Sequence, residues 1–192
     1  RKYEKEQQYQ ARIVRELAKK VRTLDERVPI VETRFLNVQQ ALYTPGVGGT
    51  MHYLTACAEG VGDQDRTGNS LFAKLMQFRC KVTSVDTDAP FVRFIFFADR
   101  LADGVIPTIA DVVFNGTMHS HHNLNFSKRF YIIRDFVVGP ASGGSAIGDP
   151  TYASTTTKLR FTITYITAAA AQAAAGPNNI YCLSFGSNAD VR

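Results

Sequence analysis

The sequence has few cysteines, no long apolar run and no apolar N-terminal segment, and each absence excludes a class of protein. Three cysteines without metal-ligand spacing predict reduced, mostly buried thiols rather than a disulfide framework or a zinc site. No stretch of about 18 apolar residues exists, so no membrane-spanning helix is predicted. The first residues lack the apolar core of a secretory signal peptide. The chain of 192 residues, 45% of them hydrophobic, is nevertheless long and apolar enough for one substantial core.

Net charge is missing from most of the chain. The first 22 residues hold eight basic residues and three acids, so they carry 8 − 3 = +5, which is the entire formal net charge. The remaining residues hold 22 − 8 = 14 basic and 17 − 3 = 14 acidic side chains. A neutral body with a cationic arm indicates a polyanionic partner such as nucleic acid. The alternative is a basic helix face that contacts solvent and has no partner. The basic residues of the arm are Arg1, Lys2, Lys5, Arg12, Arg15, Lys19, Lys20 and Arg22.

Residues 3–28 are predicted to form one long helix that ends before Pro29, because proline inside a helix removes a hydrogen bond and clashes. Its apolar residues recur every three or four positions in a narrow stripe, typical of a coiled-coil seam, and the basic residues fall on the opposite face. Such a helix is marginal alone in water and needs a partner helix or a polyanion. The alternative is a helix packed on its own domain. The seam residues are Ile13, Leu17, Val21, Leu24 and Val28.

Beyond the arm, β-branched and aromatic residues gather in short runs separated by Gly, Pro, Asn and Asp. This pattern predicts an all-β fold, an eight-stranded antiparallel jelly-roll sandwich with a basic N-terminal α-helix. The expected domains are a basic amphipathic helical arm over residues 1–34 and a jelly-roll shell domain over 35–192. The predicted strands are 50–58, 71–85, 91–98, 129–138, 158–167 and 180–185, with 35–42 as a further candidate.

Three segments between these strands have their own predictions. A short helix is expected at 108–114, where Thr108 and Asp111 form a capping signature. Residues 139–150 are expected to form a surface loop. The alanine-rich run at 168–175 is interpreted as a loop with weak helical tendency.

Two loops contain residue types that bind metals. His119 and His121 form an H-x-H pair of the kind with which some jelly-roll enzymes hold iron or manganese, but no glutamate follows Glu59 to complete such a site. A solvated loop is the simpler interpretation. Residues 62–70 gather carboxylate, amide and hydroxyl oxygens suited to Ca²⁺, without the spacing of a helix–loop–helix calcium site. A tight polar turn is the alternative there.

The segment Glu59–Asn69, leading into a long strand, is similar to the coat proteins of small spherical viruses. Further blocks occur in one order at Arg93–Arg100, Ile106–Val113, Lys128–Asp135 and Gly176–Tyr181. These blocks resemble the coat proteins of the satellite tobacco necrosis virus family, and the resemblance covers roughly residues 50–187. The same pattern is similar to capsid proteins of small circular single-stranded DNA viruses. The resemblance implies a non-enzymatic jelly-roll subunit that assembles with itself into an icosahedral shell, commonly of 60 copies (T = 1), inside the host cell, and a location in the virion with no membrane partner.

The resemblance also implies roles for particular residues. The basic helices would point inward, bundle near the threefold axes and contact packaged RNA or single-stranded DNA. No cofactor is required, but a structural Ca²⁺ at subunit contacts is implied, with Thr67 and Ser70 as carbonyl ligands. Asp25 matches an acidic residue at the end of the arm, and Asp190 is a candidate for the C-terminal carboxylate.

The sequence thus predicts a viral capsid protein, with two alternatives kept open. One is a metal-dependent, cupin-like jelly-roll enzyme that uses His119 and His121. The other is a trimeric cellular binding module with the helix as a coiled-coil stalk. Because the chain starts with Arg1 rather than Met, further basic residues are expected upstream, and a further strand is expected after Phe185.

Overall fold

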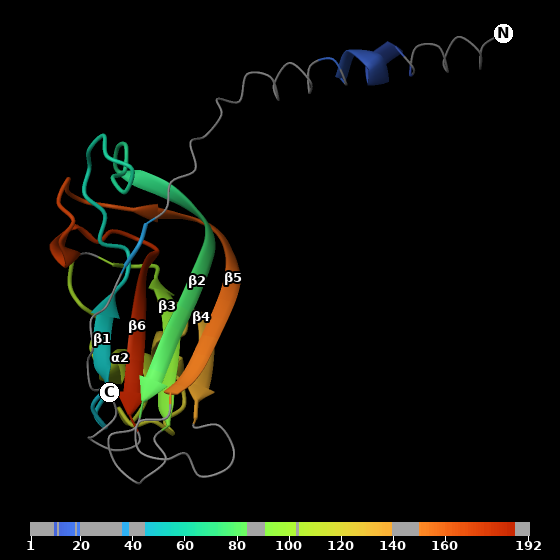
Figure 1. The fold of residues 1–192 in the computed structure, drawn as a ribbon. Helices are drawn as coiled ribbons and strands as arrows, with labels where there is room; N and C mark the ends of the chain where they lie inside the picture. Colours follow the sequence, from blue (N-terminus) through green and yellow to red (C-terminus); the bar gives the residue numbers. More distant parts are fainter. Residues whose placement is uncertain are drawn as a thin grey trace. The chain divides into compact units, whose positions relative to one another are not determined.

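The computed structural model describes residues 10, 12–17, 19, 36–38, 45–83, 91–102, 104–139 and 150–186. The chain divides into two compact units, Arg1–Arg34 and Phe35–Arg192 (Figure 1). In the first unit every described residue is helical. The predicted helix over 3–28 is therefore observed near its middle, and its two ends and Pro29 lie outside the described residues. No described helix has the length and apolar character needed to cross a bilayer.

Six strands in the second unit form two antiparallel sheets (Figure 1). The larger sheet has the order β1–β6–β3–β4, and the other pairs β2 with β5 along a long curved ribbon. The prediction of an all-β domain is confirmed, although the described residues form six strands rather than eight. The strands are β1 (Thr50–Tyr53), β2 (Ser70–Thr83), β3 (Val92–Asp99), β4 (Phe130–Val138), β5 (Pro150–Thr164) and β6 (Asn179–Gly186).

Between β3 and β4 the chain forms turns and short helices instead of strands. Gly104 and Gly116 have positive φ angles of 86° and 62°, a backbone conformation that does not continue a strand. A single antiparallel bridge joins Val113 to His122 in this segment. The two short helices there are α2 (Ile109–Val112) and η1 (Leu124–Phe126). These turns account for part of the difference between the predicted and the observed number of strands.

Helix α2 begins where the capping signature predicts. The backbone N–H of Thr108 donates to the Asp111 carboxylate over 2.8 Å, as in a capping box. The helix ends at Val112, earlier than the predicted 114, because Val113 is extended with φ −128° and enters the bridge with His122.

Strand β5 begins at Pro150, well before the predicted start at 158. Residues 151–157 are small or hydroxylated and lack a large apolar repeat, but threonine is β-branched and suits a strand that pairs with β2. The predicted loop at 139–150 falls almost entirely outside the described residues. In the predicted loop at 168–175, the only helical turn among the described residues is η2 (Gln172–Ala174). Of the candidate strand at 35–42, only 36–38 are described, and they are not in a strand.

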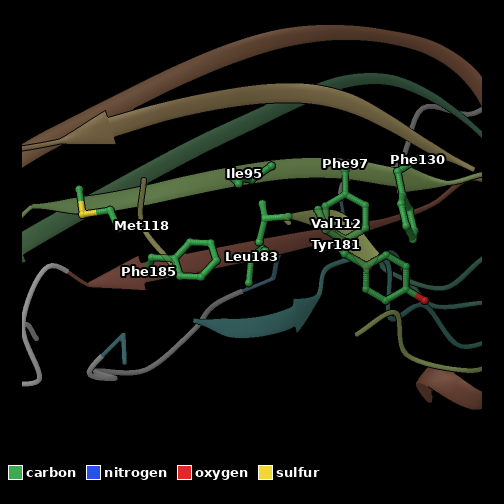
Figure 2. Close-up of a cluster of buried hydrophobic side chains, with 9 residues drawn as sticks. Ile95, Phe97, Val112, Met118, Phe130, Tyr181, Leu183 and Phe185 are labelled. Carbon is green, nitrogen blue, oxygen red and sulfur yellow. The ribbon is translucent and has the colours of Figure 1, made fainter. Parts of the chain in front are cut away.

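The core is centred on β3 and β6, which are the two inner strands of the larger sheet. All eight residues of β6 are buried. Successive side chains of β3 point to opposite faces, so Ile95 and Phe97 pack with Tyr181 in one cluster (Figure 2), whereas Phe94 packs in another. Strands buried on both faces have nearly continuous apolar sequences, which explains the run at 91–98.

None of the three cysteines forms a disulfide, and the prediction that they are mostly buried is confirmed. Cys57 and Cys182 are buried, and Cys80 is half-buried. Burial raises the pKa of the Cys182 thiol, and the nearby Cys80 raises it further, which keeps the less reactive protonated form.

A buried asparagine joins three segments at the start of β6. The Asn179 side chain is fully buried. Its Oδ1 accepts hydrogen bonds from Tyr53 Oη over 2.8 Å and from Thr55 Oγ1 over 2.5 Å. Its Nδ2 donates to the carbonyls of Thr164, over 2.6 Å, and Gly176, over 2.8 Å. Every hydrogen-bonding position of this amide is occupied, as a buried polar side chain requires.

A buried ion pair fixes the adjoining end of β3. Asp99 is fully buried and accepts two hydrogen bonds from the Arg129 guanidinium, over 3.0 Å from Nε and 2.7 Å from Nη2. The backbone N–H of Leu101 donates a third over 3.0 Å. This bidentate geometry is the strongest form of arginine–carboxylate contact.

Candidate nucleic-acid interface

The arm helix separates basic and apolar side chains onto different faces. An α-helix turns by about 100° per residue, so Arg12, Arg15 and Lys19 lie on one side and Ile13 and Leu17 on the other. Among the remaining predicted contact residues, Arg1, Lys2, Lys5, Lys20, Arg22, Val21, Leu24 and Val28 lie outside the described residues. The structure therefore provides the geometry of the middle of the arm only.

Neither face of this helix is covered by described residues of its own unit. Ile13 is 38% and Leu17 56% exposed, unusually high for apolar residues at helical spacing. On the basic side, Arg12 Nε lies 3.4 Å from Glu16 Oε1, an exposed pair of the kind that contributes little to stability. The apolar side is therefore available to a partner helix, and the basic side to an anion.

The polar loop before β2 is held together by the buried Arg66. Its side chain is almost inaccessible, and its guanidinium donates to the carbonyls of Cys57, Gly68 and Thr167. The guanidinium carbon also lies 4.2 Å from the centre of the Tyr165 ring. These contacts tie the loop to the chain that follows β5, so this arginine has a structural role.

Only Thr67 and Ser70 of the four implied calcium ligands are described, and these two alone do not complete a site. Thr67 and Ser70 are exposed and offer only neutral oxygens, whereas Ca²⁺ takes six to eight oxygen ligands that include carboxylates. The positively charged Arg66 already bonds the intervening carbonyl of Gly68. Asp25 and Asp190 lie outside the described residues, so calcium binding stays a prediction.

The histidine loop does not provide a metal site in the part of the chain that the structure describes. His119 and His121 are exposed and line a surface cavity of about 510 Å³ together with other residues of 114–125. Within the described ranges, no three His, Cys, Asp or Glu side chains are grouped closely enough to hold a metal ion. The H-x-H pair therefore gains no support as the centre of an enzyme.

The third histidine of this loop instead takes part in an ion-pair cluster. Asp135 accepts from Arg93 over 2.9 Å and 2.6 Å, and His122 Nε2 lies 2.9 Å from the same carboxylate. Half-burial acts to raise the pKa of the Asp135 carboxyl, but the hydrogen bonds and charge of Arg93, together with His122, outweigh it and hold the pKa below its ordinary value.

This lowered pKa predicts a component of stability that is lost in acid. A carboxyl whose pKa is lower in the folded state stabilises the protein fully above its unfolded pKa, and this contribution is lost as the pH falls through the folded value. The wild-type unfolding free energy should therefore fall more steeply below about pH 4 than that of Asp135→Asn. Denaturant titrations between pH 2 and 6 measure this slope, with the exposed Asp63→Asn as control. Equal slopes in wild type and Asp135→Asn would contradict the assignment.

A second group of basic side chains, not predicted from the sequence, lies on the solvent-facing side of β2 and β5. The two strands contain five basic residues and no acid. All five are exposed. A count of charge by segment would have revealed them, because the neutral total of the body conceals their separation from the acids. They are Lys74, Arg79, Lys81, Lys158 and Arg160.

The match to a known protein family extends over both units of the chain. One protein family, described as satellite tobacco necrosis virus coat protein, has a model that matches residues 3–191. A search of the curated proteins found no match. The family match confirms the resemblance found in the sequence, and it extends through the helical arm as well as the β domain. Coat proteins are structural components of the virion. The chain therefore belongs to the satellite tobacco necrosis virus coat protein family and is a viral coat protein.

Proposed function

We propose that this coat protein assembles with copies of itself into a closed shell in the host cell and packages single-stranded nucleic acid through its basic N-terminal helix. The observation that carries the proposal is the division of that helix into two faces. Ile13 and Leu17 suit packing against the helices of other copies, and Arg12, Arg15 and Lys19 suit contacts with phosphates. Such contacts would be independent of base sequence.

The arrangement of the copies is part of the same proposal. The exposed apolar side chains of the arm favour helix bundles, which we place near threefold axes of a shell of 60 subunits. The subunit needs no catalytic activity for this role. Imaging of assembled particles tests both the number of copies in the shell and the presence of helix bundles.

We further propose that the two sheets are the halves of a jelly roll. In the larger sheet, β6 pairs with both β1 and β3, from which it is far apart in the sequence, as in Greek-key connections. The bridge between Val113 and His122 would mark the short remaining strand pair. Strand β6 already lies between β1 and β3, so the further strand expected after Phe185 is not needed to complete that sheet.

Neutralising the basic face of the arm should weaken the binding of nucleic acid. The variant Arg12→Gln/Arg15→Gln/Lys19→Gln loses up to three phosphate contacts. The binding constant should then depend less steeply on salt. The negative slope of log K against log salt should become shallower by about 2, since each contact to a single strand contributes about 0.7. Fluorescence anisotropy with a labelled single-stranded oligonucleotide measures this slope. The matched control, Arg100→Gln/Lys128→Gln/Arg134→Gln, removes three exposed charges from the β domain and should leave the slope unchanged.

Electron microscopy of the purified protein separates the proposal from its alternatives. Closed particles of uniform diameter support the shell. Discrete trimers would support a binding module with a helical stalk, and monomers would contradict assembly altogether. If the triple variant of the arm keeps the wild-type salt dependence, the role of the arm is wrong even where shells form.

A further inference from the structure

We propose that the solvent-facing side of β2 and β5, here called the β2–β5 face, is a second binding surface for single-stranded nucleic acid. The β2–β5 face comprises the exposed side chains of Ser70–Thr83 and Pro150–Thr164. The inference rests on the proposed packaging function but uses residues on a different unit of the chain from the arm. Three independent features of the face support it: its charge, its backbone geometry and its exposed rings.

The charge of the β2–β5 face has one sign. Its two strands carry five basic side chains and no acid, whereas the rest of the body holds 14 − 5 = 9 basic residues against 14 acids. Arg79, Lys158 and Arg160 form no ion pair with any described residue. An acid-free surface with several cations attracts polyanions, and each cation that meets a phosphate releases a counterion.

The backbone of β5 is irregular where these charges are most concentrated. The register of the β2–β5 pairing shifts between Ala73 and Leu75, which places Lys74 opposite a bulge in β5. Arg160 lies in this bulge with a φ of 91°, although only glycine adopts such a conformation without strain. Bulges redirect side chains and occur often at functional sites. Here the bulge lies beside Lys158, so three cations gather around it.

The exposed rings indicate which polyanion the surface fits. Phe72 is 54% and Tyr152 71% exposed, and they lie towards opposite ends of the ribbon. The strand between them spans roughly 30 Å, at 3.3 Å per residue, which is enough for several nucleotides. Bases of a single strand stack on such rings while the phosphates meet the cations, whereas a sulfated polysaccharide offers no base to stack. The surface therefore favours single-stranded nucleic acid.

The first test removes charge at the bulge from the full-length chain. The variant Lys158→Gln/Arg160→Asn keeps a residue that tolerates positive φ, and the control Lys128→Gln/Arg134→Gln removes the same charge elsewhere. Binding is measured by anisotropy titrations with a labelled mixed-sequence single-stranded oligonucleotide. In the first variant only, the negative slope of log K against log salt should become shallower by about 1.4, which is twice the 0.7 of one contact. Equal slopes in the two variants would overturn the proposal.

A second variant guards against a loss of fold. Arg160→Gly removes the charge and also relieves the positive φ, so it should unfold no more easily than wild type and still bind more weakly. Tyr152→Leu removes the ring but no charge. It should weaken binding of the oligonucleotide about tenfold, the effect of one stacked base, and leave binding of heparin unchanged. If the charge variants lose only heparin binding, the surface recognises sulfated polysaccharide and the inference is wrong.

The arm variant makes the two proposals separable. If the arm variant keeps the wild-type slope and the bulge variant does not, the packaging role of the arm fails and the β2–β5 face stands. If only the arm variant changes the slope, the inference about the β2–β5 face fails and the proposed function stands. Additive reductions in a combined variant support both.

Discussion

Asn179→Ala is expected to lower the unfolding free energy by about 3–5 kcal/mol, a large part of the 5–15 kcal/mol typical of a domain. The alanine would remove one hydrogen-bond partner from each of four groups at this buried site: the hydroxyls of Tyr53 and Thr55 and the carbonyls of Thr164 and Gly176. The Thr164 carbonyl would keep the N–H of Gly176, and the Thr55 hydroxyl would keep the N–H of Ile180. Each buried group without a hydrogen bond costs about 1–3 kcal/mol, and partial relaxation reduces the sum.

Urea unfolding followed by far-UV circular dichroism measures this loss as a shift of the midpoint. Asn179→Asp adds a second comparison, because it keeps the shape of the side chain but replaces two donor hydrogens with a carboxylate oxygen facing two carbonyls. It should destabilise at least as much at neutral pH. Asn125→Ala makes the same chemical change at an exposed position and should stay within about 0.5 kcal/mol of wild type. A loss below about 1 kcal/mol in Asn179→Ala would show that the amide is dispensable.

Arg129→Met should cost a similar amount, about 3–5 kcal/mol, because it leaves the buried Asp99 carboxylate with one backbone donor instead of three hydrogen bonds. The methionine fills much of the same volume, so the loss reports the missing charge rather than a cavity. Since the penalty comes from an unpaired buried charge, removing that charge as well should restore stability.

The double variant Asp99→Asn/Arg129→Met makes this test specific. It is expected to recover most of the loss, because an ion pair replaced as a whole often costs little. Arg100→Met, which removes a neighbouring exposed arginine, should have a small effect and serves as the control. If the double variant is no more stable than Arg129→Met, the unpaired carboxylate is not the cause of the loss.

Local signals in the sequence predicted the elements that depend on neighbouring residues. The cap of α2 was recognisable because Thr108 and Asp111 are three residues apart and bond to each other. The inner strand β3 was recognisable because burial on both faces requires a nearly continuous apolar run. The hydroxylated first half of β5 was missed, since its strand conformation depends on pairing with β2 rather than on a repeat of its own.

The candidate sites also differ in whether they depend on neighbouring residues or on long-range pairing. The arm's basic face follows from helical phase within 22 residues, whereas the β2–β5 face arises only when two segments far apart in the sequence pair. Asn179 stands in a Gly-Pro-Asn-Asn run that is typical of a turn. Nothing near it in the sequence indicates that Tyr53 and Thr55 reach its side chain. Sites built by long-range pairing thus escape analysis of composition and spacing.

The position of β6 has a consequence for how the protein is made. This strand is the last of the described chain, yet it lies between β1 and β3 and brings every one of its residues into the core. While the ribosome is still translating, β1 and β3 have no partner between them, so the larger sheet cannot close until the C-terminal part has emerged. A product terminated before Asn179 would lack this inner strand and could not form the larger sheet. Only subunits translated through Gly186 would then be competent to enter a particle.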